Sequence, residues 1–186
     1  MPAAIAYRAT AGVKRNVNHE HNGLPTCHLF AEEFKLFRWG LIPFFMSDYE
    51  KAMQLRTSTL NCVSEEMYNT PSYREAAKNA QRCLIPVSGF YEWRWLDEKG
   101  TVKIPYYVTF RDQKVRSIGG LYSRWKDSET GEYQYTYTVL TTMATAILEY
   151  VHNNKQSMPV FNAQENEKEW LKKHPHKDKE IDRCTP

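Results

Sequence analysis

Cysteine is scarce in this sequence, and none occurs before position 27. The four cysteines are Cys27, Cys62, Cys83 and Cys184. They are widely spaced with no C-x-x-C pair, which argues against a disulfide framework. The opening MPAAIAYRAT lacks the apolar core of a secretory signal, and no apolar run is long enough to span a bilayer. We therefore expect a cytoplasmic protein with no membrane segment.

Basic residues only slightly outnumber acidic ones: the sequence has 25 Lys and Arg and 22 Asp and Glu, which gives a net charge of +3. Residues 165–186 hold six basic and six acidic side chains, so the excess lies in the preceding part. This balance permits contact with a polyanion without requiring it, since strong electrostatic nucleic-acid binders are far more basic. The 12 Tyr, 8 Phe and 5 Trp favour strands and could also stack on bases.

The length of 186 residues fits a single domain over 1–186, with a polar tail from about 172. Alternating patterns predict strands over 34–39, 82–85, 90–93, 105–110, 115–121, 135–142 and 158–161. Helical patterns cover 49–60, 71–77, 144–152 and 165–173, with Asp48 as an N-cap. We expect Gly119-Gly120 to end a strand. The fold class predicted is α+β, with a mainly antiparallel, barrel-like sheet flanked by helices.

The segment from Arg82 to Trp93 (RCLIPVSGFYEW) is the likeliest place for chemistry, because it sets one carboxylate, Glu92, between two aromatics after a break at Gly89. In a strand, Phe90 and Glu92 would share one face. A carboxylate on an apolar face loses solvation and becomes able to exchange protons near neutral pH. The alternative is that Tyr91 and Trp93 face the core and Glu92 faces water, and alternation alone favours this alternative.

Four blocks, in the same order and with the same spacing, resemble the SOS response-associated peptidase (SRAP) family of abasic-site processing proteins. The resemblance covers residues 34–171. The blocks are Phe37 to Phe45 (FRWGLIPFF), Thr59 to Glu65 (TLNCVSE), Arg82 to Trp93, and Val139 to Thr142 with Val151-His152 and Met158 to Val160.

The resemblance implies a sensor of abasic sites in single-stranded DNA that forms a covalent crosslink through its N-terminal residue. In the family, an N-terminal cysteine traps the sugar aldehyde as a thiazolidine and also removes a leader peptide where one exists. Carried over by motif, Asn61 would orient the N-terminal residue, Glu92 would move the proton that opens the sugar ring, and His152 would assist Schiff-base formation. Beside an amide and an imidazole, Glu92 is better interpreted as a proton carrier than as a solvated strand residue. As alternatives, His152 could end a helix and Asn61 could cap one.

The same resemblance predicts DNA contacts on residues in or beside these blocks. The DNA-binding candidates are Arg38, Trp39, Pro43, Phe44, Phe45 and Arg82. Pro43 would act as a wedge, the aromatic rings would stack on splayed bases, and the arginines would neutralise phosphates. Trp39 could equally belong to the core. The implied partner is single-stranded DNA containing abasic sites, bound by a monomer without a cofactor or a metal.

The sequence departs from the family pattern at the position of the nucleophile, because Pro2 follows Met1 and an internal cysteine has no free amine. The family's Asn-Ala-Arg is Asn61-Cys62-Val63 here, and Ser157 stands where arginine is common, so phosphate binding should be weaker. If Met1 is removed, Pro2 offers a secondary amine that can form an iminium without a thiol. The alternative function is a non-catalytic binder of single-stranded DNA, or a truncated, inactive member of the family.

A metal site is a further alternative, since four ligand-type residues fall within ten positions. They are His19, His21, Cys27 and His28. Their spacing fits no usual zinc module, and the Asn-Gly between them favours an exposed hairpin loop. We therefore expect no metal there.

Overall fold

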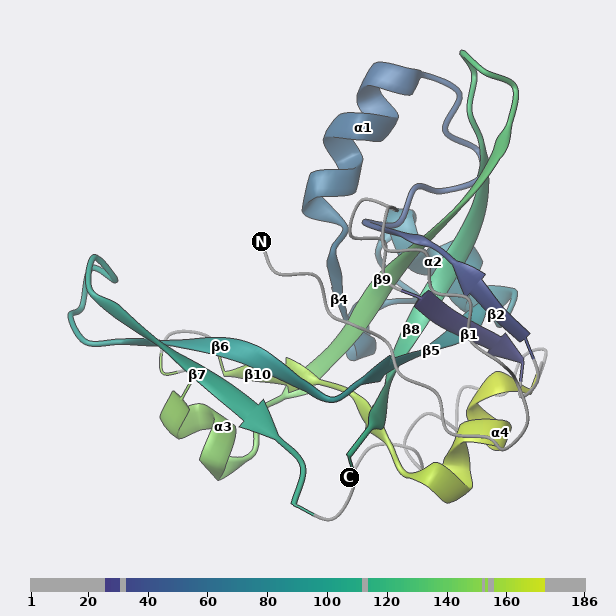
Figure 1. Ribbon diagram of the computed structural model, residues 1–186. Coiled ribbons are helices and arrows are strands. Elements are labelled where there is room, and N and C mark those ends of the chain that lie inside the picture. Colours follow the sequence, from purple (N-terminus) through teal and green to yellow (C-terminus); the bar gives the residue numbers. More distant parts are fainter. Residues whose placement is uncertain (1–25, 31–32, 112–113, 152, 154–155, 173–186) are drawn as a thin grey trace, which may run out of the picture.

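The computed structural model describes residues 26–30, 33–111, 114–151, 153 and 156–172 (Figure 1). In this part of the chain, nine strands form one mainly antiparallel sheet, and two more form a separate ribbon. The sheet strands are β1 (Thr26–Phe30), β2 (Glu33–Leu36), β3 (Arg38–Trp39), β4 (Asn61–Val63), β5 (Arg82–Val87), β8 (Arg116–Lys126), β9 (Tyr133–Met143), β10 (Ser157–Pro159) and β11 (Phe161–Asn162). The ribbon strands are β6 (Gly89–Trp95) and β7 (Lys103–Thr109).

The main path of the sheet runs β10-β9-β8-β5-β1-β2, while β3 and β4 add to β9 as parallel neighbours and β11 adds to β8. The predicted class, α+β with a mainly antiparallel sheet, is confirmed. Within the described residues the sheet does not close into a barrel, because β10 and β2 lie at opposite ends of its main path.

Four helices and two 3-10 turns accompany the strands in the described part. They are α1 (Tyr49–Ser58), η1 (Ser64–Glu66), α2 (Pro71–Lys78), α3 (Ala146–Val151), η2 (Gln164–Asn166) and α4 (Glu167–Leu171). Asp48 caps α1 as predicted, because its Oδ1 accepts a hydrogen bond from the Lys51 amide at 3.0 Å. No helix among the described residues has both the length and the apolar character needed to cross a bilayer.

The two faces of the sheet carry different partners. One face, here called the helix face, packs Leu121 and Leu140 in the same cluster as residues of α2 and α4, and places Trp125 against Ala52 of α1. The other, here called the ribbon face, carries a second cluster that includes Tyr137. Because side chains alternate along a strand, the register assigns every β8 and β9 residue to one of these faces.

Gly119 and Gly120 do not end a strand, so this prediction is wrong. β8 continues through them to Lys126. A Cβ on Gly120 would lie 2.6 Å from the Thr138 carbonyl oxygen and 2.7 Å from Cδ1 of Ile85. The glycine therefore permits close packing between strands instead of a turn.

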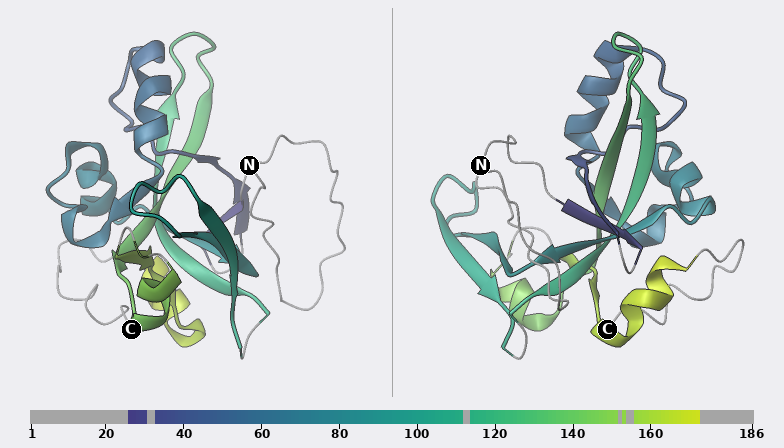
Figure 2. Two further views of the ribbon diagram at one scale, coloured as in Figure 1. Left: turned by 90° about the vertical axis from the view of Figure 1, so that its left-hand side faces the viewer. Right: turned by 45° about the vertical axis from the view of Figure 1, so that its right-hand side comes forward.

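Beyond the points where β5 and β3 stop pairing, β8 and β9 continue as a two-stranded arm, residues 124–135, which extends alongside α1 (Figures 1 and 2). The turn predicted at 128–131 closes it, with Gly131 at a φ of 74°. The buried Asp127 carboxylate accepts hydrogen bonds from the amides of Glu129 and Thr130, which fixes the turn.

Candidate functional site

One edge of β9 brings the widely separated motif blocks together. In series along this edge, β3 pairs at Thr136 and Tyr137, β4 pairs from Val139 to Thr141, and β10 pairs from Thr141 to Met143. Three of the four predicted blocks therefore lie side by side on one strand.

Asn61 opens β4 with an exposed side chain and a fixed backbone. Its carbonyl accepts a hydrogen bond from the Tyr73 hydroxyl at 3.0 Å. The carbonyl of the preceding Leu60 accepts bonds from Trp39 Nε1 at 2.8 Å and from Thr138 Oγ1 at 3.1 Å. The alternative role of a helix cap does not apply in this structure, since Asn61 begins a strand three residues after α1 ends.

Trp39 lies partly on the surface, with 40% of its area exposed. Its ring stacks on Tyr137, with centroids 6.4 Å apart and planes 14° apart. Asn61 pairs with Val139, which is two residues beyond Tyr137, so the amide, the indole and the tyrosine ring lie on the ribbon face. Trp39 is thus both a packing residue and an available stacking surface.

Glu92 lies in β6 opposite Tyr106, and its Oε1 accepts a hydrogen bond from the Trp93 amide at 3.1 Å. Tyr91 and Trp93 are 58% and 49% exposed, whereas Glu92 is only partly exposed. The alternative that placed those two aromatics in the core is therefore wrong. Phe90 and Glu92 lie on the same side of strand β6, as predicted. The Phe90 ring is 5.8 Å from that of Phe161, which packs against the cluster on the ribbon face of the main sheet.

His152 lies outside the described residues, but the residues around it contact the strand that carries Glu92. The Asn153 side chain accepts from the Trp95 amide at 3.0 Å and donates to the Trp95 carbonyl at 2.9 Å. The Arg94 guanidinium lies 4.0 Å from the centroid of the Tyr150 ring and donates to the Tyr150 carbonyl. The sequence patterns gave no signal for these anchors, because Arg94 and Asn153 look like ordinary surface residues.

The predicted DNA contacts divide by burial. Phe44 and Phe45 are 56% and 53% exposed and meet edge to face at 5.6 Å, and Arg38 is exposed on β3. Pro43, by contrast, is buried. Arg82 is 7% exposed, and its guanidinium lies 5.1 Å from the Trp170 ring on the helix face. In this conformation protein atoms cover Pro43 and Arg82, whereas Arg38, Phe44 and Phe45 are open to solvent.

Glu65 was not singled out from the sequence, although it ends the second block. Its carboxylate accepts hydrogen bonds from Thr142 Oγ1 at 2.8 Å and from Ser64 Oγ at 2.9 Å. Partial desolvation acts to raise the pKa of Glu65, but bonds from its own amide, Thr142 and Ser64 outweigh it and hold the pKa below its ordinary value. Glu65 therefore ties the turn after Asn61 to the end of β9, beside β10.

Cys62, the cysteine next to Asn61, is not a ready nucleophile. Burial raises the pKa of its thiol to about 12, and the nearby charges of Glu65 and Glu66 add to the effect. We expect Cys62 to resist iodoacetamide in the native protein at mildly alkaline pH and to react fully after unfolding in urea. Peptide mass spectrometry after a short pulse measures this. Rapid native labelling of Cys62 would show that the thiol is more accessible than the structure indicates.

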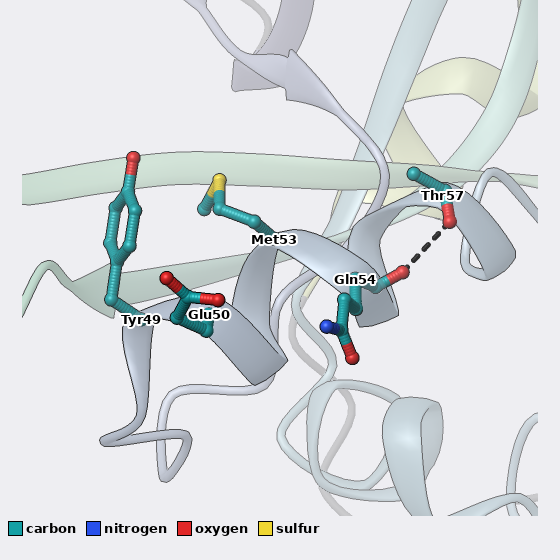
Figure 3. Close-up of a pocket in the computed structure, with 5 residues that line it drawn as sticks. All are labelled: Tyr49, Glu50, Met53, Gln54 and Thr57. Carbon is teal, nitrogen blue, oxygen red and sulfur yellow. Dashed lines mark hydrogen bonds between the residues drawn. The ribbon is translucent and has the colours of Figure 1, made fainter.

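A shallow hollow runs along α1 and is lined by residues of that helix only (Figure 3). They are Tyr49, Glu50, Met53, Gln54 and Thr57. The Thr57 hydroxyl donates to the Gln54 carbonyl at 2.8 Å, a bond within the helix. The hollow contains none of the predicted site residues, and α1 packs on the helix face, away from Asn61.

Metal ligation has no support within the described residues, where no three His, Cys, Asp or Glu side chains group together. The metal alternative is not tested by this, since His19 and His21 lie outside those residues.

In a comparison with known proteins, the family model SOS response associated peptidase (SRAP) matches residues 8–185. Abasic site processing protein YoqW of Bacillus subtilis is 37% identical over 134 residues, which are 72% of this chain and 55% of YoqW. Abasic site processing protein HMCES of Gallus gallus is 29% identical over 153 residues, 72% of this chain and 44% of the relative. The chain thus spans about half the length of these curated relatives.

Solved structures share the fold. A crystal structure of a protein from Bacteroides thetaiotaomicron has a TM-score of 0.78 and 35% identity, covering 87% of this chain and 67% of that one. A protein from Bordetella bronchiseptica has a TM-score of 0.69 and 25% identity, covering 84% and 80%.

Proposed function

The chain belongs to the SRAP family, and from this premise we propose that it recognises abasic sites in single-stranded DNA and captures the sugar aldehyde through its N-terminal residue. Two relatives, YoqW and HMCES, are named as abasic site processing proteins. Removal of a leader peptide, the other activity that the family name suggests, would use the same N-terminal position.

The observation that carries this proposal is the edge of β9. Its hydrogen bonds hold Asn61 and Trp39 on one face of the sheet, so an exposed carboxamide lies beside an exposed indole. A carboxamide can orient an amine through hydrogen bonds, and an indole can stack on a base next to the lesion. Glu92 lies on the inward face of the ribbon, in line with a role in proton transfer.

The chemistry requires only an amine and proton carriers. Glu92 passes a proton to the ring oxygen of the abasic sugar as the hemiacetal hydroxyl loses one, which opens the ring to the aldehyde. The amine nitrogen attacks the aldehyde carbon, and the resulting carbinolamine loses water to give an iminium, with His152 assisting the proton transfers. With a Pro2 amine, the product stays an iminium because no thiol closes a thiazolidine.

The test is borohydride trapping on single-stranded DNA that carries one abasic site. Hydride reduces the iminium to a stable amine, so a covalent adduct on a denaturing gel is the expected result. Peptide mass spectrometry of the adduct should locate the DNA on the N-terminal peptide. Undamaged DNA of the same sequence is the control, and an intact mass of the protein shows whether a leader has been removed.

A non-catalytic binder of single-stranded DNA is the second candidate, favoured by the exposed rings of Trp39, Phe44 and Phe45. It would bind with salt-sensitive affinity and give no adduct. An adduct on internal lysines alone, or wild-type trapping by a protein whose N-terminal amine is chemically blocked, would remove the N-terminal residue from the proposal.

A further inference from the structure

The β8–β9 arm has a basic and aromatic surface that the proposed site does not use. The register pairs Arg124 with Tyr135 and Lys126 with Tyr133, so these four side chains share the ribbon face of the arm. Lys35 of β2 adds a third cation, since its Nζ lies 5.5 Å from the centroid of the Tyr135 ring. These five residues, Lys35, Arg124, Lys126, Tyr133 and Tyr135, are named here the arm face.

The arm face is accessible at its outer end. Tyr133 is 54% exposed, and both Arg124 and Lys126 are exposed. The Arg124 guanidinium lies 3.7 Å from the centroid of the Tyr133 ring, a cation–π contact that holds charge and ring together. The helix face of the arm, by contrast, is occupied, because Trp125 packs against α1 there.

The arm face is continuous with the proposed site along one strand. Every second residue of β9 points to the ribbon face, which gives Tyr133, Tyr135, Tyr137 and Val139. Val139 is the register partner of Asn61. Phe37 stacks on Tyr135 at 5.2 Å, which fills the stretch between the arm and Trp39 with aromatic rings. Tyr133 and Val139 are six positions apart along β9, a span of about 20 Å.

We propose that the arm face binds the single-stranded DNA that flanks the lesion. The chemistry fits this partner, because cations neutralise phosphates and an exposed ring stacks on a base of any sequence. A span of about 20 Å holds at most about six nucleotides, the number that fits at the compact duplex rise of 3.4 Å per nucleotide. This proposal rests on the proposed function for one point, the position of the lesion near Asn61. DNA binding by the arm itself needs no covalent step.

The test compares non-covalent binding of undamaged single-stranded oligonucleotides by fluorescence anisotropy. Lengths of about 4 and about 16 nucleotides bracket the site sizes of comparable binding surfaces. Tyr133→Ala should weaken binding of the long oligonucleotide by about fivefold or more. Arg124→Gln with Lys126→Gln should lower the slope of log affinity against log salt by about 1.4, or 0.7 for each phosphate contact. The short oligonucleotide, which cannot cover the whole span, should bind the wild type more weakly than the long one does.

Matched variants elsewhere serve as controls. Tyr107→Ala removes a tyrosine of nearly equal exposure, 51%, from the β6–β7 ribbon, and Arg74→Gln removes a surface cation from α2. Both should bind as the wild type does. Tyr133→Phe keeps the ring and should retain affinity, which separates stacking from a folding defect.

The outcomes also separate this proposal from the proposed function. Arm variants that weaken long-DNA binding while borohydride trapping fails would support the arm face and overturn capture. Arm variants with wild-type affinity and salt slope would overturn the arm face while leaving capture intact. A wild-type protein that binds neither oligonucleotide overturns the arm face as well.

Discussion

Trp170→Ala is expected to lower the free energy of unfolding by about 3–5 kcal/mol, the usual cost of truncating a buried aromatic side chain to alanine. Trp170 is 1% exposed in the helix-face cluster. Its Nε1 donates to the Cys83 carbonyl at 3.1 Å, and its ring covers the buried Arg82 guanidinium. The substitution therefore leaves a cavity, an unpaired carbonyl and an uncovered cation together. Urea denaturation followed by circular dichroism measures the loss.

Two control substitutions separate these contributions. Trp170→Phe keeps most of the ring but removes the hydrogen bond, and should cost about 1–3 kcal/mol. Lys168→Ala changes an exposed position of the same helix, α4, and should stay within about 0.5 kcal/mol of the wild type. A Trp170→Ala variant that unfolds within about 1 kcal/mol of the wild type would show that α4 contributes little to the core.

Local features of the fold were predictable where a short pattern determines the structure. Asp48 before an apolar helical pattern identified the start of α1, and Ser-Glu-Thr-Gly identified the turn of the arm. The alternation from Phe90 to Trp93 predicted a strand in which Phe90 and Glu92 share a face. Taken alone it favoured Glu92 on the outward face, and this was wrong, because both faces carry aromatic side chains and the structure exposes Tyr91 and Trp93.

Pairing between distant segments was not predictable. The pattern over 34–39 indicated one strand, but β2 pairs with β1 and β3 pairs with β9. The chain changes partner at Phe37, a fully buried residue, and only the tertiary contacts show this. Gly119 and Gly120 suggested a strand end for a similar reason, since a turn glycine and a close-packing glycine look alike in sequence.

The candidate site was predictable through the family resemblance more than through its physics. Asn61 alone could not be distinguished from a helix cap, and the parallel pairing of β4 on β9 that places it beside Trp39 has no local signal. Burial of Pro43 and Arg82 also depends on tertiary packing: Arg82 on β5 faces Trp170 because the register of β5 with β8 turns it toward the helix face.

Glu92→Gln is expected to slow adduct formation on abasic single-stranded DNA by about 100-fold to 10,000-fold, the range for loss of a general acid–base group. Glutamine keeps the size of the side chain and an oxygen that can accept the hydrogen bond from the Trp93 amide, so the ribbon should be unchanged. It cannot carry the proton that opens the sugar ring. The measurement is the single-turnover rate of borohydride-trapped adduct, with DNA affinity determined in parallel.

Affinity for undamaged DNA should be the same in Glu92→Gln and in the wild type, because the proton carrier acts on the sugar and not on phosphates or bases. Glu98→Gln is the matched control: Glu98 is exposed in the turn of the same ribbon, and its loss should leave both rate and affinity unchanged. A Glu92→Gln variant that forms adducts at the wild-type rate would exclude Glu92 as the proton carrier. Equal loss of rate and affinity would instead assign Glu92 to binding, because a group that acts only in the chemical step cannot change the affinity for DNA without a lesion.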